Sequence, residues 1–154
     1  MYWNGTITDD DGHNQIATTG DAHYHLGNYY NWTAAVAMSD SSNYEDDGTD
    51  VDQSICPAGW MLPKYSGNDS FYNLINGRYT SGTSGNIHLS PAYFAYGGDF
   101  DGDLRVVGYG GYHWSSVVSS EEDAYGLFFR ANGSLNPQGY YWRYYGLSVR
   151  CLAR

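Results

Sequence analysis

The second half of the chain alternates apolar and polar positions with a period of two, which is typical of short strands. Residues 124–130 are the clearest case, because Tyr125, Leu127 and Phe129 fall on one face of such a strand. The opposite face, which we expect to point outward, carries Gly126, Phe128 and Arg130. Further strands are expected at 104–107, 113–117 and 147–152, with a turn at Asn132-Gly133.

The first half of the chain predicts two helices. Residues 30–38 place apolar side chains at helical spacing, and the polar run at 39–42 ends this helix. A second helix is expected over 69–76, with Asn68 or Asp69 as its cap and a stop at Gly77. Its apolar face comprises Phe71, Leu74 and Ile75. Helices followed by strands predict an α+β fold, with two helices packed on short antiparallel strands joined by long irregular loops.

The length of 154 residues fits a single domain over 1–154 with a sizeable core, and 42% hydrophobic residues is typical of a globular chain. No apolar run approaches the ~20 residues of a membrane-spanning helix, so no membrane insertion by this segment is expected. Residues 1–5 have neither a basic start nor an apolar run, so no signal peptide or anchor is expected in this chain.

The formal net charge is −10, from 7 Lys and Arg against 17 Asp and Glu. This shortage of basic residues argues against a nucleic-acid partner and against an anionic membrane surface. The acids of 99–103 lack the spacing of an EF-hand, so solvated loops are the simpler interpretation and no cofactor is expected. A calcium site of another type around Asp99, Asp101 and Asp103 stays open as the alternative.

The two cysteines, Cys56 and Cys151, are far apart in the chain and form neither a zinc nor a redox motif. One interpretation is a disulfide that closes a loop of about 95 residues, which the chain-entropy argument values at about 4 to 5 kcal/mol. The other is a pair of buried free thiols.

Motifs that would indicate an enzyme are missing from the sequence, so catalysis is not expected. There is no nucleophile elbow, phosphate-binding loop, dinucleotide fingerprint or zinc-protease motif. His113 stands close to Ser115 and Ser116, but nothing in the pattern orients it as a catalytic base.

Aromatic residues are the unusual feature of the composition: 17 Tyr, 5 Trp and 5 Phe stand beside 20 Gly. Tyr, Ser, Gly and Asn dominate antibody paratopes, because Tyr gives a large contact area at low entropic cost. Residues 140–145 (YYWRYY) concentrate the side chains that dominate interface hot spots, in a segment too aromatic for an ordinary solvent loop. The alternatives are half-buried strand residues and a core-facing aromatic group, although not all five rings can point inward from one strand.

Five phrases, taken in order, resemble one known family. They are LGNYYNWTA at 26–34, SICPAGWMLP at 54–63, HWSS at 113–116, AYGL at 124–127 and YYGLSVRC at 144–151. The set resembles the Fibrobacter succinogenes major paralogous domain family, which overlaps the variable proteins of diversity-generating retroelements. The resemblance covers about residues 26–152.

The resemblance implies a C-type-lectin-like fold with a hypervariable, ligand-binding region at about 109–151. It implies framework positions at Trp114, Tyr125, Leu127, Phe129, Gly146, Val149, Arg150 and Cys151. It implies diversified, ligand-binding positions at Tyr112, His113, Gly126, Phe128, Arg130, Gly139, Tyr140, Tyr141 and Trp142. The partner would be a protein or another surface ligand, and the chain would be extracellular, displayed on a cell or a virion.

Two other functions accompany this resemblance. One is a calcium-dependent carbohydrate-binding surface adhesin, although the usual Glu-Pro-Asn tripeptide is replaced by Asn136-Pro137-Gln138. The other is an enzyme that reuses the fold through a reactive cysteine, which pairing of Cys56 with Cys151 would remove.

Overall fold

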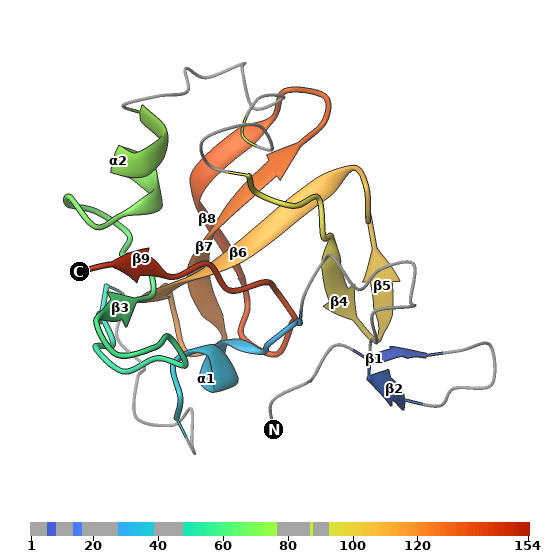
Figure 1. Ribbon diagram of the computed structural model, residues 1–154, viewed down its shortest axis with the longest axis horizontal. Helices are drawn as coiled ribbons and strands as arrows, with labels where there is room; N and C mark the ends of the chain where they lie inside the picture. The colour runs from blue at the N-terminus through green and yellow to red at the C-terminus, as the bar shows by residue number, and fades with distance from the viewer. Residues whose placement is uncertain (1–5, 9–13, 17–27, 39–47, 77–86, 88–92) are drawn as a thin grey trace.

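A three-stranded antiparallel sheet runs through the middle of the protein, as the computed structural model shows (Figure 1). The structure describes residues 6–8, 14–16, 28–38, 48–76, 87 and 93–154. The sheet has the order β6 (Gly110–Val118), β7 (Asp123–Arg130) and β8 (Leu135–Trp142). Three two-stranded pairs accompany it: β1 (Thr6–Thr8) with β2 (Asn14–Ile16), β3 (Trp60–Met61) with β9 (Leu152–Ala153), and β4 (Asp99–Asp101) with β5 (Asp103–Arg105).

Strand β6 is buried along its whole length. On one edge it pairs with β7. On its other edge it bonds to residues that lie far away in sequence: Trp114 N–H donates to the Ser148 carbonyl at 3.0 Å and Val118 N–H to the Thr49 carbonyl at 2.9 Å. These partners give β6 the environment of a central strand, so neither of its edges is left to solvent.

The sheet separates two core layers, because successive side chains of a strand point to opposite faces. Core layer one lies around Tyr112 and Trp114 of β6 and includes Trp32, Val36, Val51, Leu62, Val118, Ala124 and Leu147. Core layer two contains Phe71, Ile75, Ile87, Phe94, Leu127 and Phe129. The predicted inward face of 124–130 is confirmed at Leu127 and Phe129, which are both fully buried.

The predicted α+β class is wrong. Among the described residues, strands account for 40% and helices for 9%, and no helix has seven or more residues. The two helices, α1 (Trp32–Ala35) and α2 (Phe71–Asn76), are too short to form a layer packed on strands. The expected C-type-lectin-like architecture, with two helices packed on strands, is therefore wrong, and the structure is mostly antiparallel β.

Tertiary contacts explain why the helix expected over 30–38 is reduced to α1. Tyr30 is held in extended backbone by a bridge to Leu147, with N–H to carbonyl bonds of 2.9 and 3.0 Å in the two directions. Asn31 then caps α1 by accepting a 2.9 Å bond from Ala34 N–H. Ala37 ends it in the left-handed region, with φ of 54°. The bridge leaves the helix a single turn.

Helix α2 follows its predicted pattern more closely. Phe71 and Ile75 are buried and Leu74 packs against core layer two, which confirms the apolar face. The cap differs from the prediction, because Ser70 Oγ, not Asn68 or Asp69, accepts the 3.1 Å bond from Asn73 N–H. The expected stop at Gly77 lies outside the described residues.

The C-terminal third differs from the prediction in where strands form. The aromatic segment 136–145, for which no strand was expected, supplies most of β8. The strand expected at 147–152 is reduced to β9 and isolated bridges. The turn at Asn132-Gly133 is confirmed, with Gly133 at φ of 95° and its N–H bonded to the Arg130 carbonyl at 3.1 Å.

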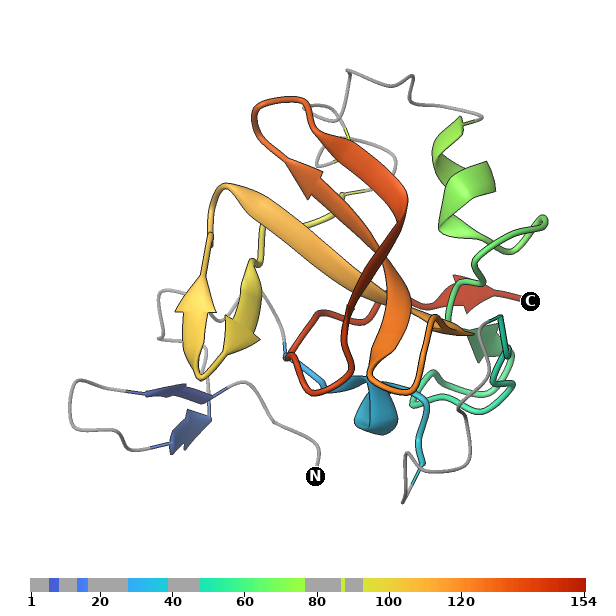
Figure 2. The same cartoon turned by 180° about the vertical axis from the view of Figure 1, so that it is seen from behind.

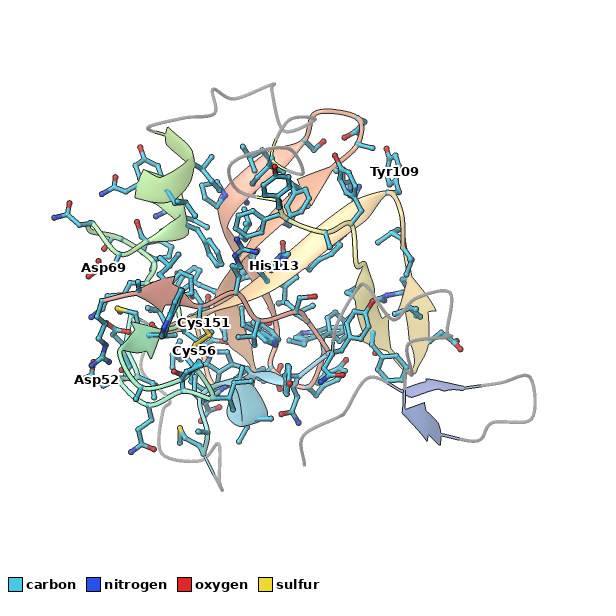
Figure 3. The ribbon with its side chains drawn as sticks, viewed as in Figure 1. Asp52, Cys56, Asp69, Tyr109, His113 and Cys151 are labelled. Atoms are coloured by element: carbon cyan, nitrogen blue, oxygen red, sulfur yellow. A yellow bond between two sulfur atoms is a disulfide. The ribbon has the colours of Figure 1, made fainter. Side chains whose placement is uncertain are left out.

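A disulfide joins Cys56 to Cys151 across 95 residues, with the two Cα atoms 5.8 Å apart (Figure 3). It fixes the C-terminal segment beside β3, where β9 pairs. Closure of a loop this long stabilises a fold by about 4 to 5 kcal/mol in the chain-entropy description. None of the helices in the described residues has the length and apolar character needed to cross a membrane.

Candidate functional site

An exposed aromatic surface forms at the end of β8. Its members are Tyr140, Trp142 and Tyr144, whose exposed fractions are 66%, 45% and 63%. Tyr140 and Trp142 alternate along the strand with Tyr141, which points inward and packs edge-on against Tyr112 with centroids 5.5 Å apart. The strand period therefore divides the aromatic run between the core and the solvent.

A tight turn after β8 brings Tyr144 back onto Trp142. Tyr145 N–H donates to the Trp142 carbonyl at 2.9 Å, which closes the turn. The rings of Trp142 and Tyr144 stack with centroids 5.5 Å apart and an interplanar angle of 22°. Tyr145 packs edge-on against both rings, at 5.4 and 5.0 Å. The two exposed rings are thus held by a third that is half-buried.

Arg105 also holds Tyr145 in place, through a contact with its ring. Its guanidinium carbon lies 4.7 Å from the Tyr145 ring centroid, within the range of a cation–π contact. Burial lowers the pKa of Arg105. The hydrogen bonds to Asp99 and the negative charge of Asp99 have a larger effect, so the pKa of Arg105 lies above its usual value. Arg105 also pairs with Asp101 at 3.0 Å. Two of the three acids of the calcium alternative, Asp99 and Asp101, are therefore bound to an arginine.

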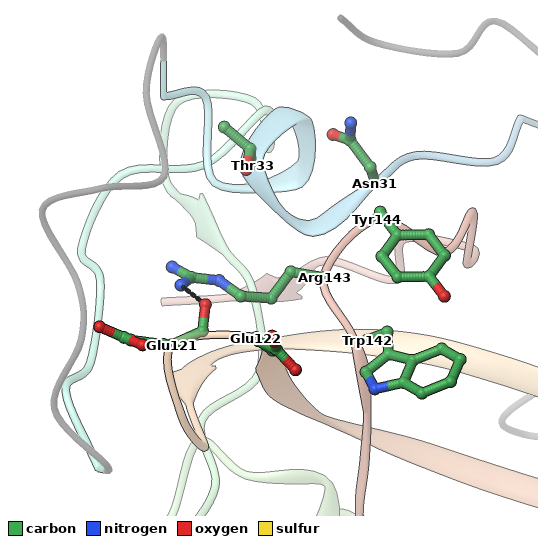
Figure 4. Close-up of a pocket in the computed structure, with 7 residues that line it drawn as sticks. All are labelled: Asn31, Thr33, Glu121, Glu122, Trp142, Arg143 and Tyr144. Carbon is green, nitrogen blue, oxygen red and sulfur yellow. Dashed lines mark hydrogen bonds between the residues drawn. The ribbon is translucent and has the colours of Figure 1, made fainter.

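A shallow hollow of about 540 Å³ opens beside the aromatic surface (Figure 4). Its walls come from the start of α1, the β6–β7 turn and the end of β8. The lining residues are Asn31, Thr33, Glu121, Glu122, Trp142, Arg143 and Tyr144. Figures 1 and 2 show the same arrangement from opposite sides, with the 143–146 loop next to α1.

Arg143 holds these walls together and is itself buried, with 6% exposed. Its guanidinium carbon lies 4.4 Å from the Trp32 ring centroid, and Nη1 donates to the Glu121 carbonyl at 2.7 Å. Its backbone N–H donates to the Glu122 carbonyl at 2.8 Å, and its carbonyl accepts from Trp32 N–H at 2.9 Å. The side chain therefore fixes the hollow and contributes little exposed surface.

The turn 119–122 presents two carboxylates at the rim of the hollow. Ser120 Oγ accepts bonds from Asp123 N–H at 3.0 Å and Glu122 N–H at 3.3 Å, which shapes the turn. Glu121 and Glu122 are exposed, and neither has an ion-pair partner among the described residues.

The nine predicted ligand-binding residues do not form one surface. Tyr140 and Trp142 are exposed. Phe128, Arg130 and Tyr141 are half-buried, and Tyr112, His113, Gly126 and Gly139 are buried. The face of β7 that was expected to point outward is covered, because Phe128 stacks on Tyr112 at 5.8 Å and Arg130 donates to the Tyr112 hydroxyl at 3.2 Å.

Two of the buried positions have no room for a diversified side chain. A Cβ on Gly126 would lie 2.6 Å from the His113 carbonyl oxygen, which belongs to the backbone and cannot move aside. His113 lies inside the molecule (Figure 3), with ring centroids 4.9 Å from Phe94 and 5.9 Å from Phe129. Burial, with a smaller effect of the Arg150 charge, lowers the pKa of His113 to about 3, so the ring is neutral at pH 7.

Sequence reasoning missed several residues of the site. Tyr144 belongs to the aromatic run, but the predicted ligand-binding positions ended at Trp142. Glu121 and Glu122 carry no signal in the sequence, because only the fold brings their turn beside the end of β8 and α1. Among the described residues, no group of three or more His, Cys, Asp or Glu side chains is placed to hold a metal ion.

Comparisons with known proteins found no relative of this chain. No protein-family model matches the chain, and neither the curated proteins nor the solved structures gave a match.

Proposed function

We propose that this chain is a target-recognition domain that binds a protein or another surface ligand through Tyr140, Trp142 and Tyr144. The observation that carries the proposal is the exposure of three large aromatic side chains within five residues, two of them stacked beside a hollow. Soluble proteins rarely leave such groups exposed together without a binding role. Tyr and Trp are also the residues that dominate interface hot spots.

The aromatic surface is held in place before any partner arrives. Pairing of β8 with β7 fixes the backbone of Tyr140 and Trp142, and the rings of Trp142 and Tyr144 are ordered by stacking on each other beside the closed turn. Ordering a mobile side chain on binding costs about 0.5 to 1.5 kcal/mol. Side chains that are already ordered avoid most of this cost, which favours a binding role.

The resemblance to the variable proteins of diversity-generating retroelements extends the proposal. On this view, diversified positions fall on the exposed aromatic surface, while β6 and β7 form the fixed scaffold. An extracellular location, on a cell or a virion, belongs to the same proposal, and the Cys56–Cys151 disulfide supports it because disulfides persist in oxidising compartments.

A binding role is proposed in place of a catalytic one. His113, the histidine considered as a base, is buried among phenylalanine rings and neutral. Both cysteines are joined in the disulfide, so neither is a free nucleophile.

The test combines Tyr140→Ala, Trp142→Ala and Tyr144→Ala in one variant. Binding of the oxidised chain to arrays of cell-surface proteins and whole cells is measured beside the variant and Tyr72→Ala, which removes a tyrosine 44% exposed on α2. We expect the triple variant to fold and to lose about 100-fold or more in affinity for any ligand found. Retained binding by the triple variant, or equal loss in Tyr72→Ala, contradicts the proposal.

A further inference from the structure

The hollow combines exposed aromatic rings with two carboxylates that no cation of the described residues pairs with, and this combination selects one kind of partner group. We propose that it takes an arginine side chain displayed on the surface of the partner protein. The inference rests on the proposed function and names the chemistry that its binding site recognises. The volume of the hollow, about 540 Å³, lies within the range of ligand pockets.

The aromatic side of the hollow suits a planar cation. The rings of Trp142 and Tyr144 line it, and no cationic group of the described residues lies over either ring. Two guanidinium groups already use neighbouring rings in this way, Arg105 on Tyr145 at 4.7 Å and Arg143 on Trp32 at 4.4 Å. A guanidinium from a partner on Trp142 would repeat a contact that this region makes twice.

The acidic side supplies the complementary charge. Glu121 and Glu122 are exposed on one turn, and neither carboxylate is paired with a cation in the described part of the chain. In the view of Figure 4, Glu122 lies between Glu121 and Trp142. Arg143 offsets part of this charge, but it is buried and binds the Glu121 main-chain oxygen. Two carboxylates against one buried guanidinium leave the hollow attractive to a cation.

Arginine fits this arrangement better than lysine. Its planar fork donates to carboxylates in pairs while its face stacks on an aromatic ring, whereas an ammonium group is a compact point charge. The chain also has a formal charge of −10, so a basic partner surface is attracted from a distance at low salt.

The experiment titrates the oxidised protein with N-acetyl-arginine amide and follows the indole N–H signals by NMR. The signal of Trp142 is assigned from its absence in Trp142→Phe. Trp32 and Trp114 serve as internal controls, because their indoles donate to the carbonyls of Ser115 and Tyr30 inside the molecule. We expect a saturable shift at Trp142 alone, with weaker binding of the matching lysine amide and none of the glutamine amide.

Charge variants distinguish the effect of the two carboxylates at the hollow from the effect of the negative charge of the whole chain. The pair Glu121→Gln and Glu122→Gln is expected to weaken arginine binding by about tenfold, and raising NaCl from about 0.05 to about 0.5 M acts in the same direction. The control pair Asp52→Asn and Asp69→Asn removes the same charge from a different hollow and is expected to change binding by less than about twofold. Equal loss in both pairs, no shift at Trp142, or tighter binding of lysine overturns the inference.

Failure of this inference is distinguishable from failure of the proposed function. A macromolecular ligand whose binding requires Trp142 and Tyr144 but is unaffected by the glutamine pair leaves the proposed function standing and overturns the arginine site. A ligand whose binding survives the triple aromatic variant overturns the proposed function, whatever the arginine titration shows.

Discussion

Strands β6 and β8 flank β7 in one sheet and carry similar aromatic residues, yet they have opposite roles. Tyr112 and Trp114 of β6 are in the core, whereas Tyr140 and Trp142 of β8 are exposed. The outer edge of β6 is covered by residues 48–51 and by Ser148, while no further strand of the described part pairs with β8. What covers a strand, more than its composition, decides whether its aromatic side chains stabilise the fold or meet a partner.

The largest expected difference between these strands is in stability. Trp114→Ala removes a fully buried indole from core layer one, and we expect a loss of about 3 to 5 kcal/mol in the free energy of unfolding. Trp142→Ala removes an indole that is 45% exposed, and we expect about 1 kcal/mol or less. The free energy of unfolding of the two oxidised variants is measured by urea denaturation. Similar losses in both would remove the distinction between the strands.

A smaller effect is expected at Gly126 of β7, which lies opposite Trp114 of β6 in the sheet. Gly126→Ala places a Cβ against the His113 carbonyl, and we expect a loss of about 1 to 3 kcal/mol as the strands separate. Gly139→Ala on β8 meets the Tyr141 hydroxyl instead, which belongs to a side chain and not to the backbone, so its loss should be smaller. Denaturation of both variants decides the order, and a reversed order would contradict this account of the two strands.

The buried histidine of β6 predicts a dependence of stability on pH. The folded pKa of about 3 lies below the usual 6.5, because burial disfavours the charged ring. The unfolded chain therefore binds the extra proton, and the stabilisation is complete above pH 6.5 and falls as the pH drops toward 3. We expect a loss of about 2 kcal/mol between pH 7 and pH 5 from this residue.

The matched variant for this pH effect is His113→Leu, which fills the same place without a titrating group. Its stability should be nearly flat between pH 7 and pH 5, measured by thermal and urea unfolding. A slope equal to that of the parent protein would show that other groups cause the pH dependence.

The smallest effect is expected on the exposed side of β8. Replacing Tyr140 with Ser, Asn or Asp should change the free energy of unfolding by about 0.5 kcal/mol or less, because the ring is 66% exposed. The same replacements at Tyr112 should cost several times more, since that ring is buried between Phe128 and Tyr141. Melting curves of the paired series measure the difference.

The retroelement proposal makes a related prediction about the coding DNA. A near-copy of the region that encodes residues 109–151 should differ at the codons of Tyr140, Trp142 and Tyr144, and not at the codons of Tyr112 and Gly126. Sequencing the flanks of the gene checks this. Differences spread equally over β6 and β8 would contradict the assignment of β8 as the recognition strand.

Local patterns in the sequence determined several features of this protein. The alternation over 124–130 gave strand β7 and its inward residues Leu127 and Phe129, and the spacing of Phe71, Leu74 and Ile75 gave the apolar face of α2. The run at 140–145 indicated an exposed aromatic group because five rings cannot share one inward face. Each of these follows from neighbours within a few residues, which a sequence displays directly.

Only the tertiary structure decided which faces are covered and which chain segments meet. The bridge from Tyr30 to Leu147 shortened α1. Side-chain contacts between distant segments buried Tyr112, His113 and the other face of β7. Residues 30 and 147, which are in contact, lie about a hundred residues apart in the sequence, and residues 122 and 143 lie about twenty apart. No local period in the sequence encodes contacts over such separations. The same long-range contacts place Glu121 and Glu122 beside Trp142, so the hollow exists in the fold and not in any one stretch of sequence.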